Sequence, residues 1–347
     1  MSKRPMPALV AAAVLLVGCT GAPASTPSGS PGAPTESKTL TVITHDSFAL
    51  SKDTIAKFKS DTGYDVKFVA PGDVGTMVNQ VVLTKESPLG DVVYGIDNSF
   101  AARAMDAGVL SPYTSAVLPA SATKFTADTA PLLTPIDYGD VCLNADTKWF
   151  KGKGLAVPQT LDDLLKPEYK ALLVVANPAT SSPGLAFLLA TIAAKGEPGY
   201  LDYWKALKAN GLEVVKGWTE AYTVEFSGSS GKGSRPLVLS YSSSPAYEPA
   251  TQSLNQTCFR QVEYAGVIAG AQNEIGARKF IDFMLSDQVQ AQIPEQMYMY
   301  PVDSAVKLPA DWAKRAALSE APFTLAVAEI AAKRDGWIKA WSAAVIG

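Results

Sequence analysis

The chain has little of what metal-dependent or nucleophilic catalysis requires. His45 is the only histidine in 347 residues, and cysteine occurs at three positions. The sequence contains no HExxH, CxxC, GxSxG or Walker motif. A zinc site would lack its usual nitrogen and sulfur ligands, and a Ser–His arrangement would have to pair His45 with a serine such as Ser47. We therefore expect a protein that is not an enzyme, with no cofactor and no metal.

The chain also has little excess of either sign of charge. Lysine and arginine number 30, aspartate and glutamate number 33, and charged residues make up 18% of the chain. No basic run stands out, so we expect no nucleic-acid partner. A hydrophobic content of 47% is typical of a globular protein. The length allows two domains of ordinary size.

The N-terminus is predicted to be a lipoprotein signal peptide at residues 1–18. A short basic stretch precedes an apolar run at residues 8–17, which is too short to span a bilayer comfortably. The run ends in Leu-Val-Gly-Cys, which is similar to a bacterial lipobox and implies lipidation of Cys19. An ordinary secretion signal is the alternative. Residues 19–38, rich in Gly, Pro, Ser and Thr, are expected to form the lipid anchor and a flexible linker.

From residue 39 onward, strand and helix patterns alternate. Residues 40–44 and 66–70 have strand patterns, and the helix between them is predicted to begin after Ser51 and to end at Gly63. A third strand is predicted at residues 91–94. This alternation predicts an α/β fold with a parallel sheet covered on both faces.

A second block is predicted to begin near residue 137. Residues 172–176 form a buried strand pattern, and an apolar helix follows with Ser182 as N-cap and Pro183 at its first position. Another strand is predicted at residues 260–268. The tail to Gly347 has a helical pattern.

Residues 217–247 form the stretch around which the chain is organised. Each end is predicted to be a strand that breaks into a helix, with aromatic and hydroxyl side chains at the break. Small ligands bind at such breaks in open α/β sheets. Aromatic faces and hydroxyls suit a flat, partly cationic ligand. The alternative is that these aromatic residues only pack at a domain edge.

Two cysteines remain after Cys19. Cys142 and Cys258 are an even pair in an exported chain, which favours a disulfide. Two unpaired buried thiols are the alternative, because the sequence gives no distance between them.

The motifs resemble those of the thiamine-binding components of bacterial ABC importers. The most specific are residues 217–222 (Gly-Trp-Thr-Glu-Ala-Tyr) and 240–247 (Ser-Tyr-Ser-Ser-Ser-Pro-Ala-Tyr). Further matching segments lie at 44–49, 91–98, 137–139, 180–184 and 299–302. The resemblance extends from residue 39 over nearly all of the chain. It implies a two-lobed periplasmic-binding-protein fold of type II that closes on a hinge, an extracytoplasmic location, and permease subunits as partners.

The resemblance also implies which residues contact thiamine or its phosphates. Asp73 would accept hydrogen bonds from the aminopyrimidine, and Tyr247 and Tyr298 would flank the rings. The hydroxyethyl or phosphate end would be lined by a larger set: Ser181, Ser182, Trp218, Tyr241, Ser242, Ser243 and Ser244. Tyr222 and Pro245 are further candidate ligand-binding residues.

His45 completes the candidate set, at a position where the family often has tyrosine. A charged imidazole would repel a thiazolium ring, so we expect His45 to be neutral when ligand is bound.

The lobe boundaries are expected at the hinge. Lobe 1 would comprise residues 39–137 together with about 262–300, and lobe 2 would comprise residues 138–261. Residues 301–347 would return to lobe 2.

Other functions remain open from the sequence. The ligand could be a polyamine, which needs several carboxylates around aromatics, but only Asp73 and Asp97 are candidates. Ferric iron needs clustered tyrosinates, whereas Tyr241 and Tyr247 are separated by a turn. A lipid-anchored, thiamine-modifying enzyme would need a nucleophile such as Cys142. A surface adhesion protein would not need the aromatic and hydroxyl groups at the strand breaks.

Overall fold

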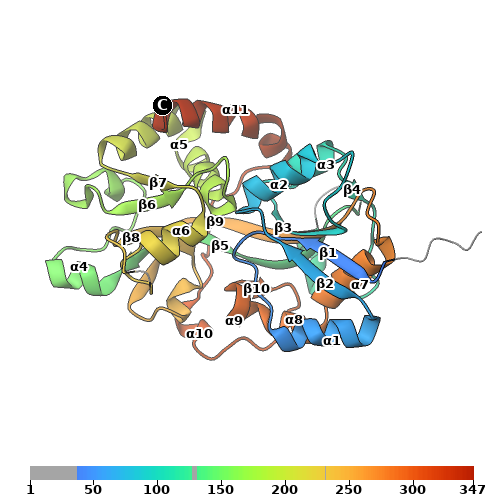
Figure 1. Cartoon of the computed structure of the whole chain (residues 1–347). Helices are drawn as coiled ribbons and strands as arrows, with labels where there is room; N and C mark the ends of the chain where they lie inside the picture. Colours follow the sequence, from blue (N-terminus) through green and yellow to red (C-terminus); the bar gives the residue numbers. More distant parts are fainter. Residues whose placement is uncertain (1–36, 127–130, 231) are drawn as a thin grey trace, which may run out of the picture. The chain divides into compact units, whose positions relative to one another are not determined.

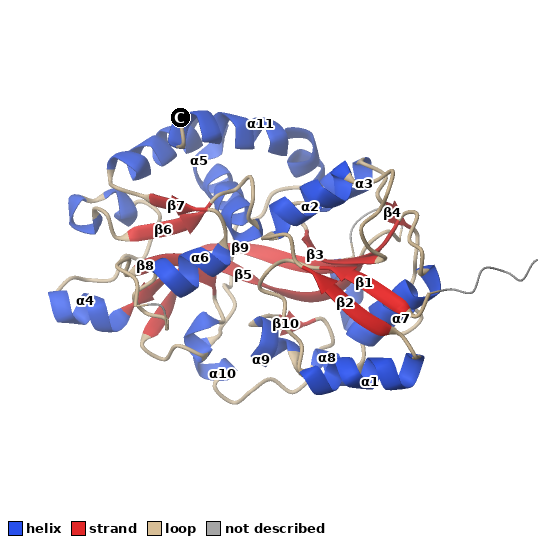
Figure 2. Ribbon diagram, viewed as in Figure 1, coloured by secondary structure: helices blue, strands red, loops and turns tan. Residues whose placement is uncertain are grey.

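The computed structural model describes residues 37–126, 131–230 and 232–347. The expected signal peptide, Cys19 and the linker up to residue 36 lie outside them. Within the described residues the strands form one mixed sheet in the order β2-β1-β3-β9-β5-β8-β6-β7, with β10 paired to β5 and β4 to β9 (Figure 2). The sheet is covered by helices, as α/β proteins require.

The strands have the following bounds: β1 Thr39–Ile43, β2 Asp65–Val69, β3 Val92–Asp97, β4 Leu110–Ser111, β5 Thr134–Asp146, β6 Leu173–Ala176, β7 Glu213–Val215, β8 Leu237–Tyr241, β9 Thr251–Ile268 and β10 Tyr300–Pro301.

The helices have the following bounds: α1 Lys52–Thr62, α2 Val74–Leu83, α3 Ala101–Asp106, α4 Thr147–Lys153, α5 Ser182–Ala209, α6 Trp218–Glu220, α7 Glu274–Met284, α8 Asp287–Gln290, α9 Ile293–Met297, α10 Trp312–Arg315 and α11 Val327–Val345. Shorter helical turns are η1 Ala120–Phe125, η2 Asp163–Leu165, η3 Pro167–Tyr169, η4 Ala221–Glu225 and η5 Ser244–Ala246.

The sheet has two parallel ends, which we name the β1 half (β1–β3) and the β6 half (β6–β8). In the β1 half, β1 pairs in parallel with β2 and β3. Helix α1 begins and ends where the sequence predicts, because Ser51 accepts a hydrogen bond from the Thr54 N–H and Gly63 adopts a left-handed conformation. In the β6 half, β6 pairs in parallel with β7 and β8.

Two long antiparallel strands, β5 and β9, join these halves (Figure 1). Strand β9 pairs with β3 on one side and β5 on the other, and β5 pairs with β8. The predicted strand at residues 260–268 is too short, since β9 begins at Thr251. Around Cys142 the sequence shows only a short strand-like run, whereas β5 extends from Thr134 to Asp146. The predicted parallel sheet is therefore correct for each half and wrong for the strands between them.

Helix α5 begins one residue earlier than predicted. Ser181, rather than Ser182, is the N-cap, and its hydroxyl accepts a hydrogen bond from the Gly184 N–H at 3.3 Å. Ser182 is the first helical residue, so Pro183 occupies the second position, where a missing N–H is still harmless. The Ser182 hydroxyl is thereby free for a different contact, described below.

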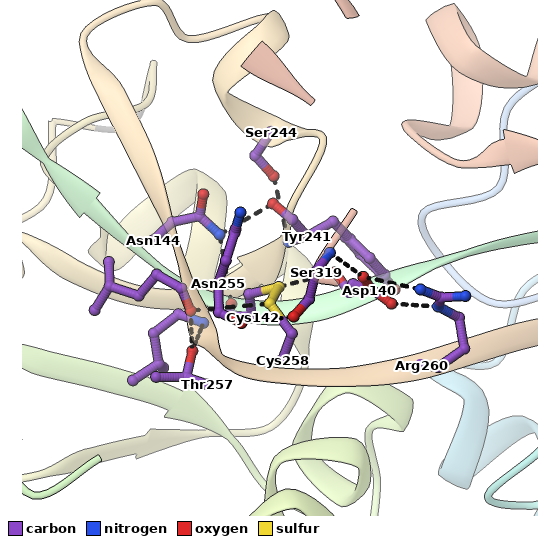
Figure 3. The surroundings of a disulfide bond; sticks show 12 residues. Asp140, Cys142, Asn144, Tyr241, Ser244, Asn255, Thr257, Cys258, Arg260 and Ser319 are labelled. Carbon is purple, nitrogen blue, oxygen red and sulfur yellow. Dashed lines mark hydrogen bonds and ion pairs between the residues drawn. A yellow bond between two sulfur atoms is a disulfide. The ribbon is translucent and has the colours of Figure 1, made fainter. Parts of the chain in front are cut away.

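Cys142 of β5 and Cys258 of β9 form a disulfide (Figure 3). The bond joins the two crossing strands beside the ion pair between Asp140 and Arg260. The Asp140 carboxylate also accepts a hydrogen bond from the Ser319 N–H at 2.7 Å, which attaches the C-terminal segment to the same place. The sequence left open whether these two cysteines are bonded or free, and in the structure they are bonded.

The C-terminal helix α11 lies along α5 and also contacts α3 (Figure 1). Its Trp341 packs edge-on against Trp204 of α5, with ring centroids 5.4 Å apart. On the other side, the Arg334 guanidinium lies 5.0 Å from the Phe100 ring, next to α3. Helix α11 therefore packs on the β6 half and also reaches the β1 half.

None of the helices in the described parts of the chain combines the length and apolar character that crossing a bilayer demands.

Candidate ligand-binding site

Asp73 connects the two halves of the sheet. Its side chain caps α2 of the β1 half by accepting a hydrogen bond from the Val74 N–H at 2.6 Å. It also accepts hydrogen bonds from the N–H groups of Ser182 at 3.3 Å and Trp218 at 2.9 Å. Burial raises the pKa of Asp73, although the hydrogen bond from Trp218 opposes this rise. One carboxylate thus binds the helix starts of α5 and α6 to that of α2.

Close backbone packing accompanies this connection. A Cβ atom at Gly75 in α2 would lie 2.7 Å from the Ala179 carbonyl oxygen. The backbone of α2 and the loop before α5 can approach each other this closely only because residue 75 is glycine.

Three buried acids form a row across the crossing strands. Asp97 of β3 is in register with Glu263 of β9, which is in register with Asp137 of β5. Directly opposed residues share a face of the sheet, and like charges in that position destabilise it. Burial raises the pKa of Asp97 to about 6, and burial together with the neighbouring Glu263 raises the pKa of Asp137 well above its ordinary value.

Hydroxyl and amide groups contact this acid row. The Tyr94 hydroxyl contacts both Asp137 and Glu263, and the Gln261 amide donates to Glu263 at 2.8 Å. The Ser182 hydroxyl donates to Asp97, which is the contact made available by the register of α5. None of the ion pairs that the described residues form brings a lysine or an arginine to these three acids; their basic neighbour is a histidine.

That histidine is His45. Its Nδ1 lies 2.8 Å from the Ser47 hydroxyl, and its Nε2 lies 3.7 Å from Glu263 Oε2, beyond hydrogen-bonding distance. Burial lowers the pKa of His45, but Glu263, Asp73 and Asp46 outweigh it, so the pKa is raised overall. These acids therefore favour the charged imidazole in this arrangement. The expectation of a neutral His45 concerns the ligand-bound protein and stays a prediction.

Gly95 makes room for this imidazole. Its backbone has a φ of 98°, a conformation that residues with a Cβ atom rarely adopt. A Cβ atom at this position would lie 2.3 Å from the His45 ring. The break in β3 at Gly95 thus positions His45 next to the acid row.

The aromatic residues of the 217–247 stretch lie beside Asp73. The Trp218 ring stacks on Tyr222 with centroids 5.1 Å apart, and it lies 6.1 Å from the Tyr241 ring. Its indole N–H donates to the Ser240 hydroxyl at 2.9 Å. Burial raises the pKa of Tyr241 well above its ordinary value, and so do the charges of Glu263 and Asp73. Trp218, Tyr222 and Tyr241, which form a first group of the predicted ligand-binding residues, therefore lie close together in the structure.

A second group lies around Tyr298. The Tyr247 and Tyr298 rings meet edge-on with centroids 4.3 Å apart, and the Ser243 hydroxyl donates to the Tyr298 carbonyl oxygen. Tyr298 adopts a left-handed backbone conformation with a φ of 57°, which is uncommon for a bulky residue. The Tyr247 hydroxyl contacts the Pro294 carbonyl oxygen and accepts from the Trp312 indole.

The serines between Tyr241 and Pro245 link the two groups. The Ser244 hydroxyl lies 2.8 Å from that of Ser240, beside Trp218, while Ser243 contacts Tyr298. Ser242 and Pro245 are buried in the same turn. These side chains pack directly against one another. A cavity of about 270 Å³ is lined by Ser242 and Pro245 together with residues of β9 and α10, whereas a larger one, of about 780 Å³, lies between α1 and α7.

Several buried polar atoms at the site have no hydrogen-bond partner among the described residues: His45 Nε2, Asp137 Oδ1, Gln261 Oε1 and Ser242 Oγ. Leaving such atoms unpaired costs about 1–3 kcal/mol each. The described residues contain no group of three or more His, Cys, Asp or Glu side chains arranged to hold a metal. The arrangement is suited to an organic ligand that carries hydrogen-bonding groups and positive charge.

Sequence reasoning misses Tyr94, Asp137, Gln261 and Glu263 as site residues. For Asp137 and Glu263, the signal that could have found them is a charged residue inside an otherwise buried strand, since such residues are almost never fully buried unless paired.

Comparison with known proteins identifies the family. The bacterial extracellular solute-binding protein family matches residues 87–325. The thiamine-binding periplasmic protein of Escherichia coli K12 is 32% identical over 88% of this chain and 93% of its own. A solved periplasmic thiamin binding protein has a TM-score of 0.78 at 30% identity, covering 88% of this chain and 96% of that chain.

A ferric binding protein from Campylobacter jejuni shares the fold with a TM-score of 0.68 at 18% identity, covering 88% and 99% of the two chains. These findings confirm the expected periplasmic-binding-protein fold and a binding protein rather than an enzyme. The chain belongs to the bacterial extracellular solute-binding proteins, in the group that includes the thiamine-binding periplasmic proteins.

Proposed function

We propose that the protein captures thiamine or one of its phosphates outside the cytoplasm and delivers it to the permease of an ABC importer. The observation that carries the proposal is the row of Asp97, Glu263 and Asp137 beside the aromatic rings of Tyr94 and Tyr241. Thiamine is flat and permanently cationic, which suits both features. The thiamine-binding relatives support the same ligand.

Both the aromatic rings and the buried acids are needed to bind this ligand. A cation over an aromatic ring gains about 0.5–2 kcal/mol per good contact, while micromolar binding needs about −8 kcal/mol. Ring contacts alone are therefore insufficient. The buried acids supply the additional attraction, because charges separated from water interact more strongly.

Binding is coupled to closure of the two halves. Asp73 lies on α2 of the β1 half, whereas Ser182 and Trp218 lie on α5 and α6 of the β6 half. A ligand that touches both halves favours the closed arrangement, and the permease would recognise that arrangement. We assign lobe 1 to residues 39–137 with about 262–300 and lobe 2 to residues 138–261, with the tail after residue 301 packed mainly on lobe 2.

The candidate contacts keep their proposed roles: Asp73 for the aminopyrimidine, Tyr247 and Tyr298 for the rings, and the serines near Trp218 for the hydroxyethyl or phosphate end.

We further propose that lipid on Cys19 holds the protein at the membrane. Radiolabelled palmitate should enter the wild-type protein and not a Cys19→Ala variant; equal labelling of both would refute the anchor.

A thermal-shift titration tests the ligand. Thiamine, its monophosphate and its diphosphate should raise the melting temperature, and Trp218→Ala should abolish the rise. Trp149→Ala, which removes a half-buried tryptophan from α4, is the matched control and should keep it. No shift with any of the three compounds would overturn the proposal.

A polyamine is the second candidate, because the sequence places two carboxylates at the site and the structure brings four there: Asp73, Asp97, Asp137 and Glu263. Spermidine belongs in the same titration, together with ferric citrate. A larger shift with spermidine than with thiamine would favour it. The enzyme alternative loses its nucleophile, since Cys142 is bonded to Cys258.

A further inference from the structure

Two adjacent cavities lie between α11 and the β1 half, away from the site described above. The first, of about 240 Å³, is lined from α2, α3 and α11, and the second, of about 190 Å³, from α3 and α11. Arg103, Arg334 and Asp335 line both. A drug-sized ligand needs about 300–1,000 Å³, so the first cavity suits a smaller molecule.

The first cavity is cationic in a protein whose net charge is negative. Arg103, Arg334 and Lys339 line it, against the single carboxylate of Asp335. The second cavity is balanced, because Asp106 joins Asp335 there. Positive charge is therefore concentrated in the first.

Arg334 is held in place for binding. Arg334 is only 7% exposed, and its guanidinium lies 5.0 Å from the centroid of the Phe100 ring. One of its nitrogens donates a hydrogen bond to Asp335 at 2.5 Å. A guanidinium has five donors, so most of them remain for another acceptor. A fixed guanidinium loses little entropy on binding.

Arg103 is the second cation of the first cavity. It is half-buried in α3 and makes no hydrogen bond or ion pair with any other residue that the structure describes. Two arginines that share a cavity match the geometry of an oxyanion, because each can donate two parallel hydrogen bonds to its oxygens. Lys339 adds a flexible point charge at the same wall.

We propose that this cavity binds a small oxyanion of the phosphate class through Arg103, Arg334 and Lys339. The inference does not depend on the proposed thiamine function. Because α3 belongs to the β1 half and α11 packs on α5 of the β6 half, an anion bound here contacts elements of both halves. It would therefore favour the arrangement in which they meet.

Isothermal titration of inorganic phosphate into the purified full-length protein, at constant ionic strength set with chloride, tests this site. Saturable binding is expected, and Arg103→Gln and Lys339→Gln should each weaken it about tenfold, the loss typical of one charge-assisted hydrogen bond. Arg278→Gln removes the same charge from an exposed position of α7 and is the matched control; its binding should equal that of the wild type.

The constant ionic strength separates a site from general screening of charge. Absence of saturable phosphate binding to the wild type would overturn the proposal. So would equal affinity of the wild type and the Arg103→Gln/Lys339→Gln double variant, because the anion would then bind elsewhere. Melting temperatures without phosphate establish that each variant is folded.

Discussion

The imidazole Nε2 of His45 lies 3.7 Å from Glu263 Oε2, with both side chains buried. Glu263 is also the middle acid of the row that includes Asp97 and Asp137. The raised pKa values of His45, Asp97 and Asp137 mean that the folded protein retains protons here that the unfolded chain would release.

We predict that the protein without added ligand is more stable near pH 5 than near pH 8. Every one of these groups has a folded pKa above its unfolded value, so the folded state binds more protons and stability falls as pH rises. The contribution of Asp97 is lost as pH rises through about 6. That of His45 is complete below its ordinary value of 6.5 and is lost above it, as pH passes the raised pKa.

Urea unfolding at about pH 5, 6, 7 and 8 measures this dependence. Glu263→Gln removes the central charge and should flatten the profile. A stability that rises steadily over this range would contradict the prediction.

Thiamine affinity should change with pH in the opposite direction. A bound thiazolium takes over the neutralisation of the acids, and a charged His45 repels it, so affinity is expected to increase from about pH 5 to 8. Calorimetric titration measures it, with His45→Gln as a variant whose profile should be flatter. Tighter binding at the lower pH would rule out a neutral His45 in the complex.

Replacement of Asp73 by asparagine should weaken both the fold and ligand binding. Asparagine still caps α2 well, but its NH₂ group cannot accept the hydrogen bond from the Trp218 N–H that the second carboxylate oxygen accepts. We expect a loss of about 1–3 kcal/mol in the free energy of unfolding and an affinity for thiamine reduced at least tenfold. The matched control is Asp61→Asn, an exposed acid of α1. Unchanged affinity in the Asp73 variant would exclude a role in recognition.

The disulfide should contribute substantially to stability. It closes a segment in which the cysteines are 116 positions apart, and removal of a native disulfide commonly costs about 2–5 kcal/mol. The double variant Cys142→Ser/Cys258→Ser should unfold at lower urea concentration than the wild type. Dithiothreitol should have the same effect on the wild type and none on the variant; identical midpoints throughout would show that the bond is dispensable.

Replacement of each of the two adjacent serines at the start of α5 by alanine should change the free energy of unfolding in a different way. Ser181→Ala removes the N-cap and should cost about 1 kcal/mol in unfolding free energy. Ser182→Ala removes the hydrogen bond donated to Asp97, a bond that lowers the pKa of this acid. Its cost should therefore grow as pH rises above about 6. A cost of Ser182→Ala that stays constant from about pH 5 to 8 would contradict the hydrogen bond to Asp97.

The sequence predicts the ends of elements better than their connections. Ser51 and Gly63 mark α1 through local hydrogen bonds and backbone conformation, which depend on a few neighbouring residues. Strand β5 lacks such local marks, because its pairing partners β8 and β9 lie about 100 residues away or more. The exact start of α5 is equally invisible, since both Ser181 and Ser182 are good N-cap residues.

The candidate site shows the same division. Trp218, Tyr241 and Asp73 are identifiable from motifs at strand ends, and in the structure they lie together. The acid row is not identifiable in this way, because only the register of β3, β9 and β5 brings its three members into line.

The β1 half and the β6 half are each built from one stretch of chain, and β5 and β9 join them. A break anywhere between Thr134 and Ile268 separates these two strands or interrupts one of them. A fragment ending in this interval would therefore lack a neighbour for a crossing strand.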